Sequence, residues 1–177
     1  MHVMLVAAMT IDGFIARTEL DRSFDWTSPE DKKFYISKLK ECDAVIMGSK
    51  TFKTFSKYPK GMHYIILTRK PDEFVNPRPE LITVDATNQT PAQIMEKLKK
   101  EGYKKVMVAG GSSIYRQFLA ADVVDSLFIT VEPVLFGSGV SLFNGSVADQ
   151  ENFKKMTLKQ VHSLSSQTIV LEYEPQK

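Results

Sequence analysis

The segment that most constrains the fold is Val106–Tyr115, in which a short β-branched run ends in two consecutive glycines. An amphipathic helical pattern starts directly after Gly110 and Gly111, so the chain is predicted to pass from a strand through a tight turn into a helix. Glycine has no Cβ, and the backbone N–H groups at a helix N-terminus attract anions, so this turn is a candidate phosphate site. The same pattern is equally typical of a connection that binds nothing.

The composition predicts a single globular domain, residues 1–177, and does not indicate a nucleic-acid, membrane or metal function. A chain of 177 residues with 43% hydrophobic and 25% charged residues is long enough for one sizeable core. The formal net charge of +2 lacks the basic excess of nucleic-acid binders. The apolar N-terminus is too short for a signal peptide or a membrane span. One cysteine and three scattered histidines give no metal-ligand spacing, and we expect a cytoplasmic protein.

Apolar runs alternate with amphipathic ones, which predicts an α/β fold with a largely parallel sheet and about four helices. Helical patterns open at Ser28, near Lys50, at Thr90 and after Gly111. The last two apolar runs are separated by a hairpin-like loop at Ser163–Gln167, so the C-terminal edge is expected to be antiparallel. The eight expected strands lie at 3–9, 43–47, 63–68, 81–84, 105–109, 126–132, 156–162 and 168–173.

Asp31 is the candidate catalytic acid. On a helix that begins at Pro29, Asp31 lies in the first turn and shares a face with Phe34 and Tyr35. A carboxyl group on the apolar side of a helix is costly unless it has a partner or a function. Burial raises its pKa and the helix N-terminus lowers it, so such an acid can hold a heterocycle and transfer a proton. The alternative is that Asp31 only caps the helix or faces water.

Two further apolar runs, ending at Gly48 and Leu67, are each followed by residues that can bind an anion. These residues are Ser49, Lys50, Thr51, Thr68 and Arg69. Ligands of open α/β sheets bind at the carboxyl ends of strands, so three such ends predict a dinucleotide with an additional 2′-phosphate. Each lysine or arginine alone is equally typical of a solvated turn. The patterns G-x-G-x-x-G and G-x-x-x-x-G-K-[ST] do not occur, which argues against a classical Rossmann site or a P-loop.

Four motifs occur in the order seen in dihydrofolate reductases, and they resemble even more closely the reductase (C-terminal) domain of the riboflavin-biosynthesis deaminase–reductase, RibD. Thr10–Gly13 and Pro133–Gly139 resemble the riboflavin enzymes, whereas Trp26-x-x-Pro29-x-Asp31 resembles dihydrofolate reductase. The resemblance implies a dihydrofolate reductase-like three-layer sandwich with a mixed, mostly parallel eight-stranded sheet. It also implies NADPH as the cofactor. The four motifs are Ala7–Ala16, Val45–Phe52, Val108–Gly111 and Leu127–Thr130.

The resemblance implies a role for each matching residue. Asp31 would anchor the substrate ring and assist its protonation, with support from Thr130. The implied substrate-pocket residues are Val6, Ala8, Tyr35 and Phe55, and Ala8 and Ile15 would pack near the nicotinamide. The implied cofactor-binding residues are Gly48, Ser49, Lys50, Thr51, Leu67, Thr68, Arg69, Ala109, Gly110, Gly111, Ser112, Ser113 and Ile114.

Two departures from the dihydrofolate reductase pattern bear on the substrate and the cofactor. Met62 stands where an arginine usually pairs with the glutamate tail of folate, and a thioether cannot replace that pair. Lys57 and His63 are the nearby residues that could compensate. Ser49 stands where an arginine often meets the cofactor phosphate, and Lys50 and Arg69 could cover that charge.

These observations favour an NADPH-dependent reductase of a small heterocycle, a riboflavin-pathway-type pyrimidine in the first instance. Dihydrofolate is the alternative substrate. A reductase of another small carbonyl or nitro compound and a non-catalytic nucleotide-binding protein remain further alternatives. Related reductase domains are often dimers, and we expect the apolar C-terminal hairpin to pair two copies into a homodimer.

Overall fold

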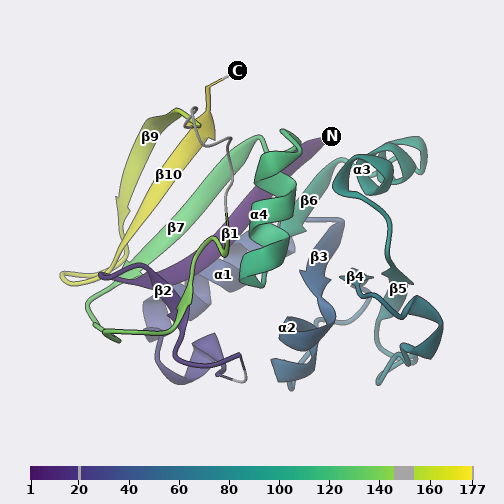
Figure 1. Cartoon of the computed structure of the whole chain (residues 1–177), viewed down its shortest axis with the longest axis horizontal. Helices are drawn as coiled ribbons and strands as arrows, with labels where there is room; N and C mark the ends of the chain where they lie inside the picture. Colours follow the sequence, from purple (N-terminus) through teal and green to yellow (C-terminus); the bar gives the residue numbers. More distant parts are fainter. Residues whose placement is uncertain (20, 146–153, 177) are drawn as a thin grey trace.

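The computed structural model describes residues 1–19, 21–145 and 154–176, and within these ranges its main element is one eight-stranded sheet (Figure 1). The strand order is β5-β4-β3-β6-β1-β7-β10-β9. All pairs from β5 to β7 are parallel, whereas β10 runs antiparallel to both β7 and β9. The mixed sheet with an antiparallel C-terminal edge is therefore confirmed. The strands are β1 His2–Thr10, β3 Ala44–Gly48, β4 His63–Leu67, β5 Thr83–Thr87, β6 Lys105–Val108, β7 Ser126–Glu132, β9 Met156–Ser163 and β10 Ile169–Pro175.

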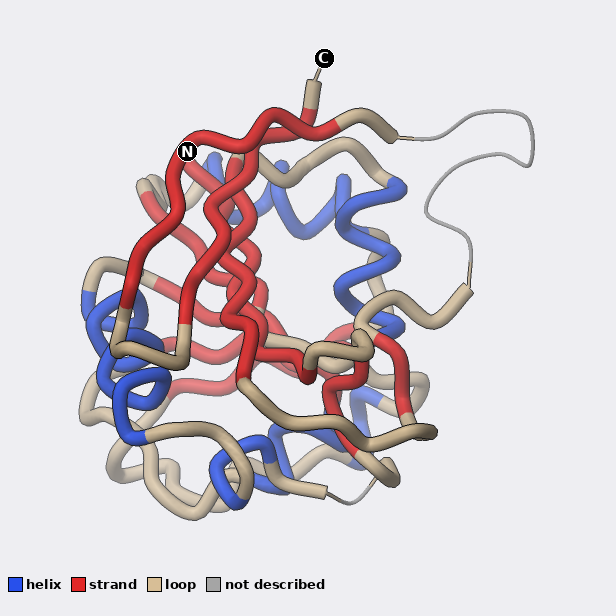
Figure 2. Tube along the Cα trace, turned by 90° about the vertical axis from the view of Figure 1, so that its left-hand side faces the viewer, coloured by secondary structure: helices blue, strands red, loops and turns tan. Residues whose placement is uncertain are grey.

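Helices cover both faces of the sheet, which gives three layers (Figure 2). The helices α3, Pro91–Lys100, and α4, Ser112–Ala120, pack on one face around the fully buried Phe118. The helices α1, Pro29–Lys40, and α2, Ser49–Thr54, cover the other face. The central strands are apolar on both sides because each face of a parallel sheet is buried under helices.

The longer helices begin where the sequence predicts. The Ser28 hydroxyl accepts a hydrogen bond from the Asp31 amide at 3.1 Å, and Pro29 follows it at the first helical position. Thr90 and Gln93 form a reciprocal capping box at the start of α3. Two short 3-10 helices were not predicted, η1 at Ser23–Asp25 and η2 at Pro71–Glu73.

Two parts of the strand assignment were wrong or incomplete. The strand expected at 81–84 is β5, Thr83–Thr87, because Ile82 is buried just before the ladder while Asp85 and its neighbours pair with β4. A small second sheet pairs β2, Phe14–Ala16, with β8, Val140–Ser141. Strands of three and two residues are too short to show the alternation of apolar and polar residues by which a strand is predicted. In the described ranges, no helix has the length and apolar character needed to cross a membrane.

Candidate active site

A cleft of about 660 Å³ lies along the carboxyl ends of the parallel strands β3, β4 and β6. Every residue expected to bind substrate or NADPH lines this cleft, from Val6 on β1 to Ile114 on α4. Thr130 lies deeper and is 1% exposed. The fold therefore brings residues from six distant segments to one cavity, while the individual roles remain predictions.

The two glycine turns lie side by side at one end of the cleft. The Gly48 amide donates a hydrogen bond of 2.8 Å to the Gly110 carbonyl. A Cβ on Gly111 would lie 3.0 Å from the Thr51 Oγ1, and a Cβ on Gly48 would lie 3.3 Å from a side-chain carbon of Ile114. The Gly110–Gly111 peptide bond is cis. A side chain at Gly48 or Gly111 would therefore crowd the neighbouring turn, because α2 and α4 begin close together.

The start of α4 has the features of an anion site. Gly111 occupies its N-cap position, and none of the described side chains caps the helix. The first-turn residues Ser112 and Ser113 line the cleft. The Ser112 hydroxyl, however, donates to the Ser141 carbonyl at 2.6 Å, so this side chain anchors β8. Backbone N–H groups are therefore what this turn offers an anion.

The cations at the same end differ in their availability. Lys50 is paired with Glu19, and Lys70 is paired with Glu73 at 2.9 Å. Arg69 is exposed on the cleft wall and has no ion-pair partner in the described part of the chain. Arg69 is therefore the cation most available to an incoming phosphate.

Asp31 also lines the cleft and is 7% exposed. Burial raises the pKa of its carboxyl group, and the nearby charge of Glu132 raises it further. The hydroxyls of Thr130 and Thr27 and the charge of Lys32 act in the opposite direction. Neither the Thr130 Oγ1 nor the Thr27 Oγ1 makes a hydrogen bond of standard distance and angle within the described ranges. Asp31 is thus buried close to Thr130, and Ser28 rather than Asp31 caps the helix.

An aromatic cluster lines the cleft beside this acid. Phe24 meets Tyr35 edge-on at 5.9 Å and Phe55 at 5.5 Å between ring centroids. On the opposite wall, the Tyr115 hydroxyl donates to the Val6 carbonyl at 2.8 Å. Sequence reasoning missed Phe24 and Tyr115 as cleft residues. Phe24 lies in a non-periodic segment, although it stands two residues before Trp26, the start of the motif that was the available signal.

Other lining residues were also missed, whereas the residues discussed for folate lie elsewhere. Met62, Lys57 and His63 do not line the cleft. His63 contacts the Tyr103 hydroxyl at 2.6 Å and Asp85 at 3.5 Å, so it does not compensate for the missing arginine. The remaining missed lining residues are Ala7, Ala16, Thr18, Glu19, Asp21, Ser23, Thr54, Thr87, Asn88, Gln89, Gln117, Val140 and Asn144.

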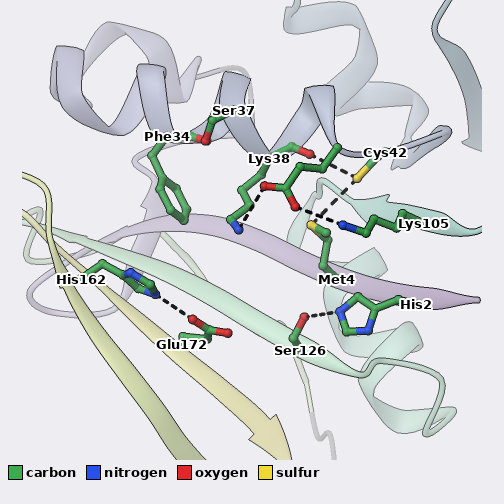
Figure 3. A network of polar contacts seen from close by, with 11 residues as sticks. His2, Met4, Phe34, Ser37, Lys38, Cys42, Lys105, Ser126, His162 and Glu172 are labelled. Carbon is green, nitrogen blue, oxygen red and sulfur yellow. Dashed lines mark hydrogen bonds and ion pairs between the residues drawn. The ribbon is translucent and has the colours of Figure 1, made fainter.

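A second group of polar contacts lies outside the cleft, between the C-terminal half of α1 and the sheet (Figure 3). The Lys38 ammonium is 4.4 Å from the centre of the Phe128 ring. On the C-terminal hairpin, His162 contacts Glu172 at 2.7 Å. These residues link α1 to β7 and the hairpin. The described residues contain no group of three or more His, Cys, Asp or Glu placed to hold a metal.

Comparisons with known proteins agree with this architecture. An uncharacterized protein of Bacillus subtilis, YwjB, is 28% identical over 164 residues, which is 88% of each chain. A putative riboflavin biosynthesis protein from Shewanella sp. PV-4 has the same fold, with a TM-score of 0.80, 18% identity and complete coverage of both chains.

A bifunctional enzyme from Thermotoga maritima contains a similar domain. It is a diaminohydroxyphosphoribosylaminopyrimidine deaminase/5-amino-6-(5-phosphoribosylamino)uracil reductase. The TM-score is 0.79 at 22% identity, over 98% of this chain and 56% of the Thermotoga chain. The profile of the RibD C-terminal domain matches residues 1–170. The resemblance seen in the sequence is thereby confirmed, and the chain belongs to the RibD C-terminal domain family, a family of reductase domains.

Proposed function

We propose that this chain is an NADPH-dependent reductase of a riboflavin-pathway-type pyrimidine, similar to a 5-amino-6-(5-phosphoribosylamino)uracil reductase. The observation that carries the proposal is that one cleft is lined both by a buried acid, Asp31, and by two adjoining glycine turns. Family membership supports the reductase class. The activity of the Thermotoga protein supports a pyrimidine substrate.

The phosphate end of the cleft fits a dinucleotide. Gly48 and Gly111 leave a space that a Cβ would narrow, and the uncapped start of α4 adjoins it. Arg69 is near enough to serve the same ligand, because it lines the same cleft. A free guanidinium at this place suits a 2′-phosphate, which distinguishes NADPH from NADH.

NADPH, when bound, supplies the hydride. Asp31 supplies the proton, because its raised pKa favours the protonated carboxyl group that can donate to a ring or imine nitrogen. Phe24, Tyr35 and Phe55 form the wall against which a flat heterocycle can stack. The burial of Asp31 keeps bulk water from competing for that proton.

Dihydrofolate is the second candidate substrate, and two observations favour it. Asp31 follows Trp26 and Pro29 with the spacing seen in dihydrofolate reductases, and it lies beside an aromatic cluster. In addition, Met62 does not line the cleft, so its replacement of the folate-tail arginine bears less directly on folate binding.

The test is to follow NADPH oxidation at the nicotinamide absorbance with the ribosylaminopyrimidine phosphate and with dihydrofolate in parallel. We expect faster turnover of the pyrimidine, and preferential turnover of dihydrofolate would favour the alternative. Melting curves with NADPH and NADH provide the binding control. A melting temperature unchanged by either cofactor would overturn the proposal, and binding without turnover would favour a non-catalytic nucleotide-binding protein.

We further propose that the protein acts in the cytoplasm as a homodimer paired through the C-terminal hairpin. β9 forms one edge of the sheet, and its Leu158 and Val161 are 49% and 50% exposed. Exposed apolar side chains on the edge strand of a sheet favour association with another strand. Light scattering should give the mass of two chains, and Leu158→Lys should shift it toward one. A monomeric wild type would contradict the dimer.

A further inference from the structure

Glu132, at the end of β7, is a buried carboxylate that the proposed reaction does not use. It is 2% exposed, and no described lysine, arginine or histidine lies within ion-pair distance of it. Burial of an uncompensated charge is costly, so such a group requires other partners or a function.

Hydrogen bonds provide those partners. One carboxylate oxygen of Glu132 accepts from both the backbone amide and the hydroxyl of Ser28, each at 2.8 Å. The other oxygen accepts from the Thr168 hydroxyl at 3.2 Å. The carboxylate therefore joins β7 and the residue before β10 to the start of α1.

Ser28 connects this network to the candidate catalytic acid. Its hydroxyl donates to Glu132 and accepts from the Asp31 amide at 3.1 Å. Side chains two residues apart on a strand share a face, so Glu132 and Thr130 both face α1. The first turn of α1 is thus held against the strand that carries Thr130.

We propose that Glu132 is a positioning residue for Asp31, on which it acts through Ser28 and as a neighbouring negative charge. The effect of Glu132 on catalysis rests on the proposed function, whereas its effect on the position and ionisation of Asp31 does not. Its structural basis is the continuous chain of contacts from Thr168 through Glu132 and Ser28 to Asp31.

The charge of Glu132 affects the protonation of Asp31. Burial first, and then the Glu132 charge, raise the pKa of Asp31, whereas Lys32 on α1 lowers it. The other titratable groups that interact with Asp31 are Tyr35 on α1 and Tyr115 on α4. Of these groups, Glu132 is the carboxylate whose negative charge raises the pKa of Asp31.

The test is a carbon-13 NMR titration of the Asp31 carboxyl group in the protein without cofactor or substrate, with Asp31→Asn to assign the resonance. Glu132→Gln removes the charge and keeps an oxygen that can accept from Ser28. We expect the Asp31 midpoint to move to lower pH in this variant. An unchanged or higher midpoint would overturn the proposal. Glu172→Gln, which removes a carboxylate paired with His162 outside the cleft, is the matched control and should leave the midpoint in place.

Glu132→Asp tests the contact with Ser28 and also serves if Glu132→Gln does not fold. The shorter side chain keeps the charge but does not reach Ser28, so the Ser28 amide should exchange its hydrogen about tenfold faster. The Asp31 midpoint should stay above its ordinary value of 3.8. Unchanged exchange, or a midpoint at the ordinary value, would contradict the proposed contact or the proposed charge effect.

The outcome separates this inference from the proposed function. If the titration responds to Glu132 but no reductase activity is found, the positioning role stands and the function fails. If NADPH oxidation depends on Asp31 but the titration ignores Glu132, the function stands and the positioning role fails. When both hold, activity should be lost at lower pH as the pH is raised in Glu132→Gln, because the alkaline limb of the profile reports the deprotonation of Asp31.

Discussion

The part of the cleft around Asp31 and the part around Gly48 and Gly111 are formed by different kinds of groups. The Asp31 end consists of buried side chains whose ionisation depends on their surroundings. The Gly48 and Gly111 end consists of backbone turns, and its most available cation, Arg69, is exposed to solvent. The Asp31 region depends on buried side chains that can ionise. The glycine region depends on the close approach of two main chains.

This difference predicts how each end responds to substitution. A change of one functional group in the Asp31 region should abolish turnover while binding of the cofactor remains. A change at the phosphate end should weaken cofactor binding while the acid stays intact. Experiments that measure turnover and cofactor binding separately can therefore test whether the two parts of the cleft act independently.

The largest expected effect is the loss of turnover in Asp31→Asn. An amide of the same shape cannot donate the proton that an acid donates, and general acid catalysis contributes roughly 10²–10⁴-fold. NADPH oxidation should fall by that order, whereas the NADPH-induced rise in melting temperature should persist. Glu30→Gln, on the neighbouring residue, should retain activity. Normal turnover by Asp31→Asn would remove Asp31 from the mechanism.

The next effect is weaker cofactor binding in Gly111→Ala. The added Cβ would lie 3.0 Å from the Thr51 Oγ1, so the Thr51 side chain or the turn that carries it must shift. We expect the NADPH affinity to fall by about tenfold or more, which corresponds to about 1.4 kcal/mol. Titration calorimetry measures this loss, and the double variant Gly111→Ala/Thr51→Ala should recover part of it. Unaltered affinity would show that the closeness of these turns does not matter.

A smaller and more selective effect is expected for Arg69→Ala. Loss of a charge-assisted contact should weaken NADPH by roughly tenfold and leave NADH nearly unaffected. Arg78→Ala, which removes an arginine paired with Glu80 outside the cleft, is the control. Equal losses for the two cofactors would mean that Arg69 does not recognise the 2′-phosphate.

The smallest effect concerns stability and has the opposite sign. Because the folded-state pKa of Asp31 is raised above its ordinary value of 3.8, the folded protein loses stability as pH rises from that value through the raised one. Asp31→Asn lacks this ionisation, so its melting temperature should exceed that of the wild type near neutral pH. The difference should shrink as the pH approaches 4 from above, and a constant difference would exclude the effect.

Much of the fold was predictable because its signals are local. Seven strands of the main sheet lie close to their predicted positions, and Ser28 and Thr90 begin helices as expected. The strand β5 was shifted because Ile82 is buried without joining the ladder. The pair β2 and β8 was missed because strands of three and two residues carry no period.

The candidate site was predictable where a motif marks it. Gly48–Thr51 and Gly110–Ile114 were identified as helix starts after strands, and all these residues line the cleft. Phe24 and Tyr115 were missed because no local pattern shows which side of a segment will face a distant cavity. Glu132 was missed as a site residue because its partners, Ser28 and Thr168, are 104 and 36 residues away.

The alternation of strands and helices, the two glycine turns and an acid on the first turn of α1 can be read from the chain alone, because these features depend on neighbouring residues. The folded structure was needed to show that Ser112 anchors β8, that His63 contacts Tyr103 and Asp85, and that Ser28 links Glu132 to Asp31. Burial and charge–charge contacts depend on which distant segments meet, and those segments come together only when the sheet assembles.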